Sequence, residues 1–323
     1  MARDLEDAAL GCLLGACIGD AAGATLEFQE RPEPVDVERA MAMSGGGVFR
    51  LAPGQITDDS ELALSLADAL SRSSSFDIEA IARSYARWIE SGPFDVGNTT
   101  RNSLGAVRTV EGAGYAAAMK RAASQNCMAS KANGSLMRIS PLAIWGHRLP
   151  DEEIARCAIE DSLLSHPHES CCHAVASYSI AAAALLRSPG DRGQAFSRAS
   201  AWANRSAGEV KSWLRAAADG ESVDYVSQIG FVRIAFVNAF QHLLRGSGYE
   251  ETIRETIAKG GDTDTNACIA GALVGAAAGA SGIPESMKAA VLECDTREGR
   301  SRPEFLLGRR VPELVSALLS ARP

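Results

Sequence analysis

The amino-acid sequence predicts an all-α fold built as a single domain. Hydrophobic residues make up 46% of the 323 residues but aromatic residues only 6%, which is typical of closely packed helices rich in alanine and leucine. No segment shows the alternation of apolar and polar residues expected of a strand. No shift in composition and no linker separates two halves, so we predict one domain over residues 1–323, with a helical tail after about residue 282.

Charge and cysteine content narrow the classes of function. Lys and Arg number 32 against 40 Asp and Glu, a net charge of −8, and the basic residues are scattered. We therefore expect no nucleic-acid partner and no membrane partner. The first residues are acidic, unlike a signal peptide, and the eight cysteines show no CxxC spacing. These features predict a cytoplasmic protein with buried free thiols, which we expect to be a monomer.

The first predicted helix starts at Asp7 and ends near Gly19. Its apolar residues have helical spacing, and three glycines give it a small face that predicts a closely packed partner helix. Asp20 and Glu27 follow without a basic partner nearby in the sequence. Buried unpaired acids cost free energy unless a ligand or metal offsets them, although Asp20 could equally cap a helix or lie on the surface. Residues 31–54 are rich in Pro and Gly and are predicted to be a loop.

Two clusters of oxygen-bearing side chains each precede a predicted helix. The first is Thr57-Asp58-Asp59, before a helix from Glu61, and the second is Asp262-Thr263-Asp264-Thr265, before a run of small residues. Carboxylate and hydroxyl oxygens suit a hard divalent cation, and if the clusters face one another they can bind two. The alternative is that both clusters are ordinary helix N-caps.

The remaining elements are predicted helices joined by polar turns. Helices are expected over 78–90, 151–164, 173–186, 229–244, 249–258 and 311–319. Asp95 lies in a polar loop and is either a turn former or a functional acid. The turn at 130–138 could approach a phosphate or sugar, or be only a turn. The His- and Cys-rich stretch 165–173 is a poor zinc site, because its two cysteines are adjacent and no second pair lies at finger spacing.

Six separated motifs, taken together and in order, resemble the ADP-ribosylglycohydrolase family, which includes the dinitrogenase-reductase-activating glycohydrolase and arginine- and serine-specific ADP-ribosyl-acceptor hydrolases. The matching stretches cover the chain from about Leu10 to about Gly282. They are Gly15 to Asp20 with Glu27-Phe28, Ile56 to Ser60, Asp95 to Thr100, Asn133 to Arg138, Ser165-His166-Pro167, and Gly261 to Ala267.

The resemblance implies a compact orthogonal helical bundle with a binuclear cleft for two Mg²⁺ or Mn²⁺ ions. By motif match, Thr57, Asp58, Asp59, Asp262, Asp264 and Thr265 would hold the metals. Glu27 and Asp95 match catalytic acids, and which of them activates the water is left open. Asn133, Gly134, Ser135, Met137 and His166 would contact ADP-ribose. Phe231 stands where relatives often carry a tyrosine near the adenine, so stacking is kept and a hydroxyl is lost.

The resemblance also implies the reaction. We expect a glycosidase that cleaves the N-glycosidic bond between ADP-ribose and a protein side chain, most plausibly arginine, and so reverses ADP-ribosylation. The substrate would be an ADP-ribosylated protein and the product ADP-ribose. Alternatives are hydrolysis of O-linked, nucleobase or free ADP-ribose substrates, or a catalytically silent binding or structural relative. A silent relative should have lost metal ligands, whereas all six matching positions are present here.

Overall fold

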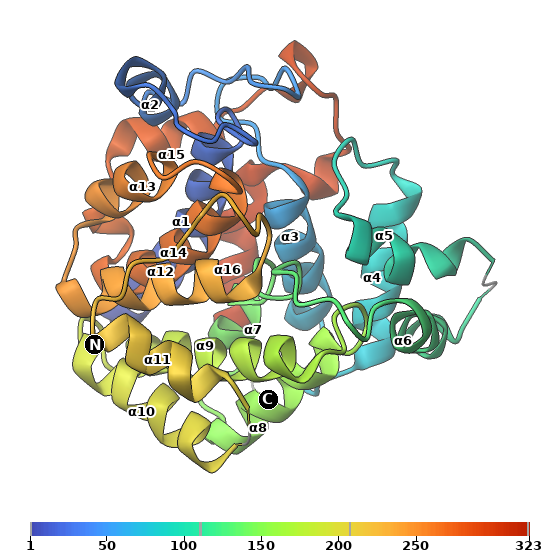
Figure 1. The fold of residues 1–323 in the computed structure, drawn as a ribbon. Helices are drawn as coiled ribbons and strands as arrows, with labels where there is room; N and C mark the ends of the chain where they lie inside the picture. Colours follow the sequence, from blue (N-terminus) through green and yellow to red (C-terminus); the bar gives the residue numbers. More distant parts are fainter. Residues whose placement is uncertain (1, 110–111, 207, 322) are drawn as a thin grey trace.

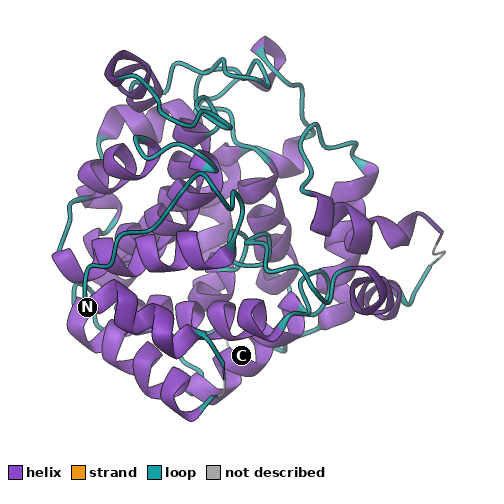
Figure 2. Ribbon diagram, viewed as in Figure 1, coloured by secondary structure: helices purple, strands orange, loops and turns teal. Residues whose placement is uncertain are grey.

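The computed structural model confirms the all-α prediction. It describes residues 2–109, 112–206, 208–321 and 323, in which sixteen α-helices and five short 3₁₀ turns occur. Within this part of the chain the only extended pairings are two isolated bridges, Gly46 with Leu51 and Ala132 with Phe231 (Figure 2). The domain prediction over 1–323 also includes residues 1, 110–111, 207 and 322, which lie outside the described residues, and it stays a prediction.

The helices surround a central pair formed by α1 (Ala2–Gly23) and α14 (Thr263–Ala278) (Figure 1). The other helices are α2 (Pro34–Met41), α3 (Asp58–Ser71), α4 (Ile78–Glu90), α5 (Asn98–Leu104), α6 (Tyr115–Asn126), α7 (Ser140–Trp145), α8 (Asp151–Ser162), α9 (Glu169–Arg187), α10 (Arg192–Arg205), α11 (Val210–Ala218), α12 (Val232–Arg245), α13 (Tyr249–Ile257), α15 (Glu285–Leu292) and α16 (Val311–Ser320).

The close approach of α1 and α14 depends on glycine, as the small-residue face predicted. A Cβ atom at Gly19 would lie 2.1 Å from the carbonyl oxygen of Ala267, and one at Gly15 would lie 2.5 Å from that of Gly271. Any side chain at these positions would push the helices apart. The Tyr249 hydroxyl also donates to the Gly15 carbonyl at 2.7 Å, which ties α13 to α1. The C-terminal end of α1 lies beside the N-terminal end of α14, and the predicted acid clusters are found at this end of the pair.

Several predicted boundaries are confirmed and others are wrong. Helix α4 spans the predicted residues 78–90, and the buried free cysteines are confirmed for all but the half-buried Cys294. The first helix, however, continues to Gly23, so Asp20 lies inside it. Residues 31–54 are not only loop, because they contain α2, with Pro34 in its first turn and Val37 and Met41 buried. Helices α6, α7 and α15 were not predicted.

Helix α9 alone among the described helices is long and apolar enough to cross a membrane by length and composition. Its most apolar window has a mean hydropathy of 1.2, and 89% of that window is buried inside the protein. A core helix passes the same test, and α9 packs against α8, α10 and α14 here.

Candidate active site

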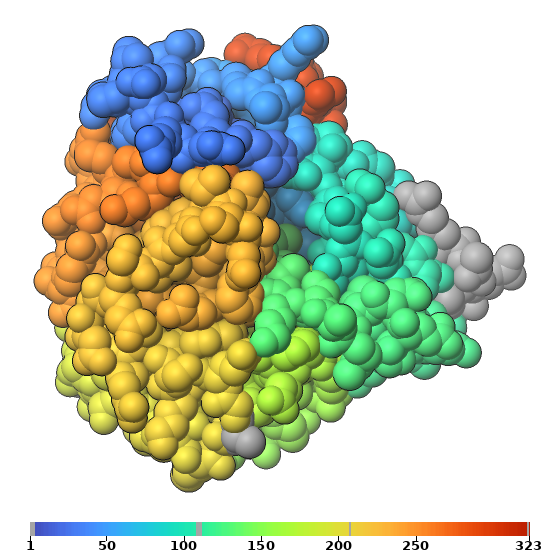
Figure 3. Space-filling view, viewed as in Figure 1, coloured from blue at the N-terminus to red at the C-terminus, as the bar shows by residue number. Residues whose placement is uncertain are grey.

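An acid-lined cleft opens where four distant parts of the chain meet. Figure 3 shows the hollow between the N-terminal segment in blue, the segment around α5 in cyan, the turn before α7 in green and the loop before α12 in yellow. Its volume is about 500 Å³, within the range of roughly 300–1,000 Å³ usual for small-molecule sites. Six carboxylates line it: Glu27, Asp58, Asp59, Asp95, Asp262 and Asp264.

The first wall is the first turn of α3, which a carboxylate from α1 holds in place. Thr57 is the N-cap, but its side chain does not cap the helix. Asp20, fully buried in α1, does so instead, since it accepts from Thr57 N at 3.0 Å and Ser60 N at 3.1 Å. The Thr57 hydroxyl also donates to Asp20 at 2.8 Å. Asp20 thus fixes the turn that presents Asp58 and Asp59 to the cleft.

The second wall is the first turn of α14. It follows Gly260 and Gly261, both with φ near +75°, and a Cβ at Gly261 would lie 2.1 Å from the Tyr225 carbonyl oxygen. Only glycine permits so tight a turn. Asp262 receives a hydrogen bond from Asn133 Nδ2 at 2.7 Å, and the Asp264 carboxylate accepts from the Thr265 amide at 2.8 Å. Acids from both predicted clusters thus line one cavity, Asp58 and Asp59 from one and Asp262 and Asp264 from the other.

The acids crowd together, and the described residues that line the cleft with them include no lysine or arginine. Ligand atoms of Glu27, Asp95 and Asp264 lie within 4.8 Å of one another. Burial raises the pKa of Glu27 to about 9, helped by the negative charges of Asp95 and Asp262. Burial and neighbouring carboxylates also raise the pKa values of Asp58, Asp59 and Asp264 well above their usual range. In the absence of a counter-charge, this cleft holds protons at neutral pH.

The raised pKa values predict a stability that falls as pH rises in metal-free protein. Unfolded Asp and Glu have lost their protons by about pH 5, whereas the folded cleft still binds protons. The stabilisation is therefore full below about pH 4 and lost as pH passes the folded pKa of Asp20, about 6, and of Glu27, about 9. In chelator, the melting temperature should be lower at pH 8.5 than at pH 7, measured by thermal unfolding.

Histidine and cysteine side chains also affect how stability depends on pH around the range from pH 7 to pH 8.5. Burial lowers the pKa of His166 to about 3 and of His242 to about 4, which adds stability on going up to about pH 7 and none beyond. Buried thiols such as Cys12, whose pKa is raised to about 12, stay protonated in the folded chain while unfolded thiols begin to ionise at about pH 8.5, so they add to the fall. Added Mg²⁺ should reduce the fall, because a cation binds the deprotonated acids. A melting temperature in chelator that rises from pH 7 to pH 8.5 would contradict the prediction.

The residues present fit a divalent cation. Within the described part of the chain, no lysine or arginine lines the cleft. Two buried carboxylate oxygens, Asp59 Oδ1 and Glu27 Oε2, have no hydrogen-bond partner. Buried charges without partners cost several kcal/mol, roughly, so such atoms point to a ligand that offsets them. Hard oxygen donors from aspartate, glutamate and threonine are those that Mg²⁺ and Mn²⁺ prefer.

The wall opposite the acids combines the turn before α7 with His166. Asn133 N donates to the Gly230 carbonyl at 3.0 Å, and a Cβ at Gly134 would lie 2.8 Å from the His166 ring. The Ser165 hydroxyl accepts from Arg138 at 2.8 Å and lies 2.8 Å from His166 Nδ1. Burial lowers the pKa of His166 and keeps the imidazole neutral, so one of its ring nitrogens donates and the other accepts.

The structure brings most of the predicted site residues together. Eleven of the fourteen line the cleft: the six acids with Thr265, Asn133, Gly134, Met137 and His166. Three do not. Thr57 is fully buried behind Asp59, and Ser135 turns into the core, where Ser162 Oγ donates to its hydroxyl at 2.9 Å. The Phe231 ring packs edge-on against Trp213 at 5.8 Å.

Some residues at the cleft were not predicted. Phe28 and Ile229 line its rim and are 57% and 45% exposed, which is unusual for large apolar side chains. Asn98 and Thr100 line it from the start of α5. Phe28 also has a φ of +66°, held by a hydrogen bond from its amide to the Gly261 carbonyl at 3.1 Å. The sequence feature that could have indicated a role for Phe28 at the cleft is its position directly after Glu27.

Comparison with known proteins finds one matching family model and relatives that align with most of this chain. The family model for ADP-ribosylglycohydrolase matches residues 1–321. The ADP-ribosyl-[dinitrogen reductase] glycohydrolase of Rhodospirillum rubrum is 30% identical over 94% of this chain and 96% of its own. The ADP-ribosylarginine hydrolase Tri1 of Pseudomonas putida (strain GB-1) is 32% identical over 86% of this chain and 72% of its own.

A solved structure shares the fold. It is described as an ADP-ribosylglycohydrolase-related protein complex and superposes with a TM-score of 0.77, at 24% identity, over 99% of this chain and 100% of that chain. Fold and site thus define an all-helical protein with a carboxylate-lined cleft for a small polar ligand. The chain belongs to the ADP-ribosylglycohydrolase family.

Proposed function

We propose that the protein is a metal-dependent hydrolase that releases ADP-ribose from modified arginine side chains of a protein. The observation that carries the proposal is the convergence of six carboxylates in one cleft whose described lining has no basic side chain. The name of one relative, an ADP-ribosylarginine hydrolase, supports arginine as the acceptor. Asp58, Asp59, Asp262, Asp264 and Thr265 would hold two Mg²⁺ or Mn²⁺ ions, with Thr57 oriented behind them by Asp20.

The chemistry proposed for this cleft is cleavage at the anomeric carbon of the ribose. Such a reaction needs a positioned water, a group that takes its proton, and a leaving group that can be protonated. When bound, divalent cations supply charge that binds hydroxyl oxygens and acidifies a nearby water. Glu27 and Asp95 are the two acids that could accept the water's proton, since both lie at the cleft beside Asp264.

The opposite wall would hold the remainder of ADP-ribose. Gly134 lets a ligand approach the backbone closely, because no Cβ intervenes, and the neutral His166 ring can form a hydrogen bond with it. Asn133 orients Asp262 through its amide and so couples the ligand wall to the acid wall. The apolar rim residues Phe28 and Ile229 are suited to contact a base or the acceptor protein.

The proposal is tested by measuring ADP-ribose release from a protein carrying ADP-ribosyl-arginine, in Mg²⁺ and in chelator. We expect release in Mg²⁺ and at least a tenfold loss in chelator, restored by Mn²⁺ or Mg²⁺. A protein carrying ADP-ribosyl-serine serves as the parallel substrate and should be cleaved much more slowly. Release that persists in chelator would overturn the metal dependence, and faster release from serine would overturn the choice of acceptor. No release from either, with ADP-ribose still bound, would indicate a silent relative.

A further inference from the structure

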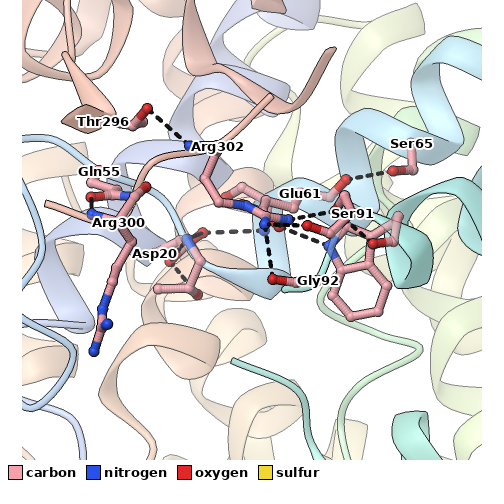
Figure 4. A network of polar contacts seen from close by, with 12 residues as sticks. Asp20, Gln55, Glu61, Ser65, Ser91, Gly92, Thr296, Arg300 and Arg302 are labelled. Carbon is pink, nitrogen blue, oxygen red and sulfur yellow. Dashed lines mark hydrogen bonds and ion pairs between the residues drawn. The ribbon is translucent and has the colours of Figure 1, made fainter. Parts of the chain in front are cut away.

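Arg302 lies in the C-terminal segment, beyond all the motifs, yet it binds Glu61 in the first turn of α3, the turn that borders the cleft. Its side chain is 4% exposed, and that of its partner Glu61 is 1% exposed. Glu61 belongs to the first turn of α3, the turn that also carries Asp58 and Asp59. Figure 4 shows the Arg302 side chain between Glu61 and the end of α4 at Ser91 and Gly92.

The guanidinium uses all five of its N–H groups. Nε donates to Glu61 Oε1 at 2.6 Å, and one terminal nitrogen donates to Glu61 Oε2 and to Ser91 Oγ, both at 2.8 Å. The other terminal nitrogen donates to the carbonyls of Ser91 and Gly92, both at 3.2 Å. Only arginine offers five donors in a fixed plane, so lysine cannot reproduce this set of bonds.

These bonds join the first turn of α3 to the residues that follow α4, just before the loop that bears Asp95. Glu61 is fixed on its far side by Trp88, whose indole nitrogen donates to it at 2.7 Å. Gly92 precedes Pro93 and Phe94, and the next residue is Asp95. The Phe94 ring lies 6.0 Å from the Arg302 guanidinium carbon. Arg302 therefore holds the loop bearing Asp95 against the helix turn bearing Asp58 and Asp59.

We propose that Arg302 is a positioning residue that sets the place of Asp95 relative to the first turn of α3. It touches no ligand and acts through Gly92 and Glu61. The kinetic consequence rests on the proposed function, whereas the structural consequence does not. Without the guanidinium, the Asp95 loop loses three hydrogen-bond donors, those to Ser91 Oγ, Ser91 O and Gly92 O, and moves more freely.

The test compares Arg302→Lys with a matched control, Arg310→Lys. Arg310 also belongs to the C-terminal segment and also binds α3, but it pairs with Asp68, away from the cleft, at 3.2 Å. We expect Arg302→Lys to lower kcat for ADP-ribose release about 10- to 100-fold, because small misplacement of a reacting group costs that much, with KM changed far less. Arg310→Lys should keep kcat within about twofold of wild type.

Amide hydrogen exchange provides a readout that does not depend on activity. Exchange in residues 94–98 should be faster in Arg302→Lys and unchanged in Arg310→Lys, while the amides of α3 should stay protected in both. Should Arg302→Lys fail to fold, Glu61→Gln has the same shape but removes the ion pair that anchors the guanidinium, and it should also speed exchange in residues 94–98, though less. Equal kcat and equal exchange in the two lysine variants would overturn the proposal. If wild type releases no ADP-ribose, the proposed function fails, and the exchange comparison alone decides for or against Arg302.

Discussion

Asp59→Asn is expected to abolish ADP-ribose release and, in chelator, to make the protein more stable. The Asp59 side chain is buried and its Oδ1 has no hydrogen-bond partner. Burial, together with the charges of Asp20 and Asp262, raises its pKa. Removing this carboxylate relieves repulsion in the metal-free cleft, which we expect to be worth about 1–3 kcal/mol in the free energy of unfolding near pH 8.

The same change should lower activity, because Asp59 is a proposed metal ligand. Its carboxylate supplies both the negative charge and the correctly placed oxygen that a cation needs. Stabilisation by a bound metal is worth several kcal/mol, so the loss in kcat/KM should be about 10³-fold or more. Thermal unfolding in chelator and in Mg²⁺ measures the two sides of the effect. Wild type should gain stability when Mg²⁺ is added, and Asp59→Asn should gain little.

Asp68→Asn is the matched control on the same helix. Asp68 is partly exposed and pairs with Arg72 at 2.9 Å and with Arg310 at 3.2 Å. Its removal should lower stability slightly and leave ADP-ribose release unchanged. The prediction for Asp59 is contradicted if Asp59→Asn melts below wild type in chelator, or if it keeps more than a tenth of wild-type activity in Mg²⁺.

The parts of the site that could be predicted from the sequence are those that depend on the spacing of residues close together in the chain. Thr57-Asp58-Asp59 and Asp262-Thr263-Asp264-Thr265 each form the N-cap and first turn of a helix, so their oxygens had to gather at a helix start whatever the tertiary fold. That the two starts meet follows from the glycine faces of α1 and α14, which were visible in the sequence as runs of small residues. The all-α fold class was predictable for the same reason, from helical periodicity.

The features that the sequence did not reveal depend on partners far along the chain. Asp20 caps helix α3 through Thr57, which lies 37 residues further along the chain. Nothing in the sequence near either residue predicts this pairing. Arg302 binds Glu61 across 241 residues. Ser135 was expected in the cleft because the motif match included it with Asn133 and Gly134, but within one tight turn adjacent side chains point in different directions. Helix α2 was missed because Pro and Gly on both sides of it dominate the composition of a short segment.

Phe231 shows how a correct motif match can misplace a side chain. The loop before α12 does line the cleft, through Ile229 and Gly230, as the match to relatives implied. The Phe231 ring instead closes an aromatic cluster with Trp213, whose own ring lies 6.0 Å from that of Phe236. The Phe231 ring is oriented by its packing against Trp213, which lies on another helix, α11.

Glu27→Gln is expected to lower kcat more than Asp95→Asn does when both are measured at saturating metal. A general base needs a free oxygen within reach of its water. Glu27 Oε2 is buried and without a partner, whereas the Asp95 carboxylate is engaged by the backbone amide of Val96 and by Asp58. We therefore expect Glu27 to take the proton and Asp95 to help hold the cations.

Two measurements separate these roles. General acid–base catalysis contributes about 10²- to 10⁴-fold, so Glu27→Gln should lose about that much in kcat while its Mn²⁺ affinity, measured by titration, stays within about threefold of wild type. Asp95→Asn should weaken Mn²⁺ binding and recover most of its kcat when metal is raised. Glu27→Gln should also remove the rise of kcat with pH on the acidic side, because that rise reports deprotonation of the base. If Asp95→Asn instead loses kcat at saturating Mn²⁺ and flattens the pH profile while Glu27→Gln does not, Asp95 is the base and the free oxygen of Glu27 serves the metal.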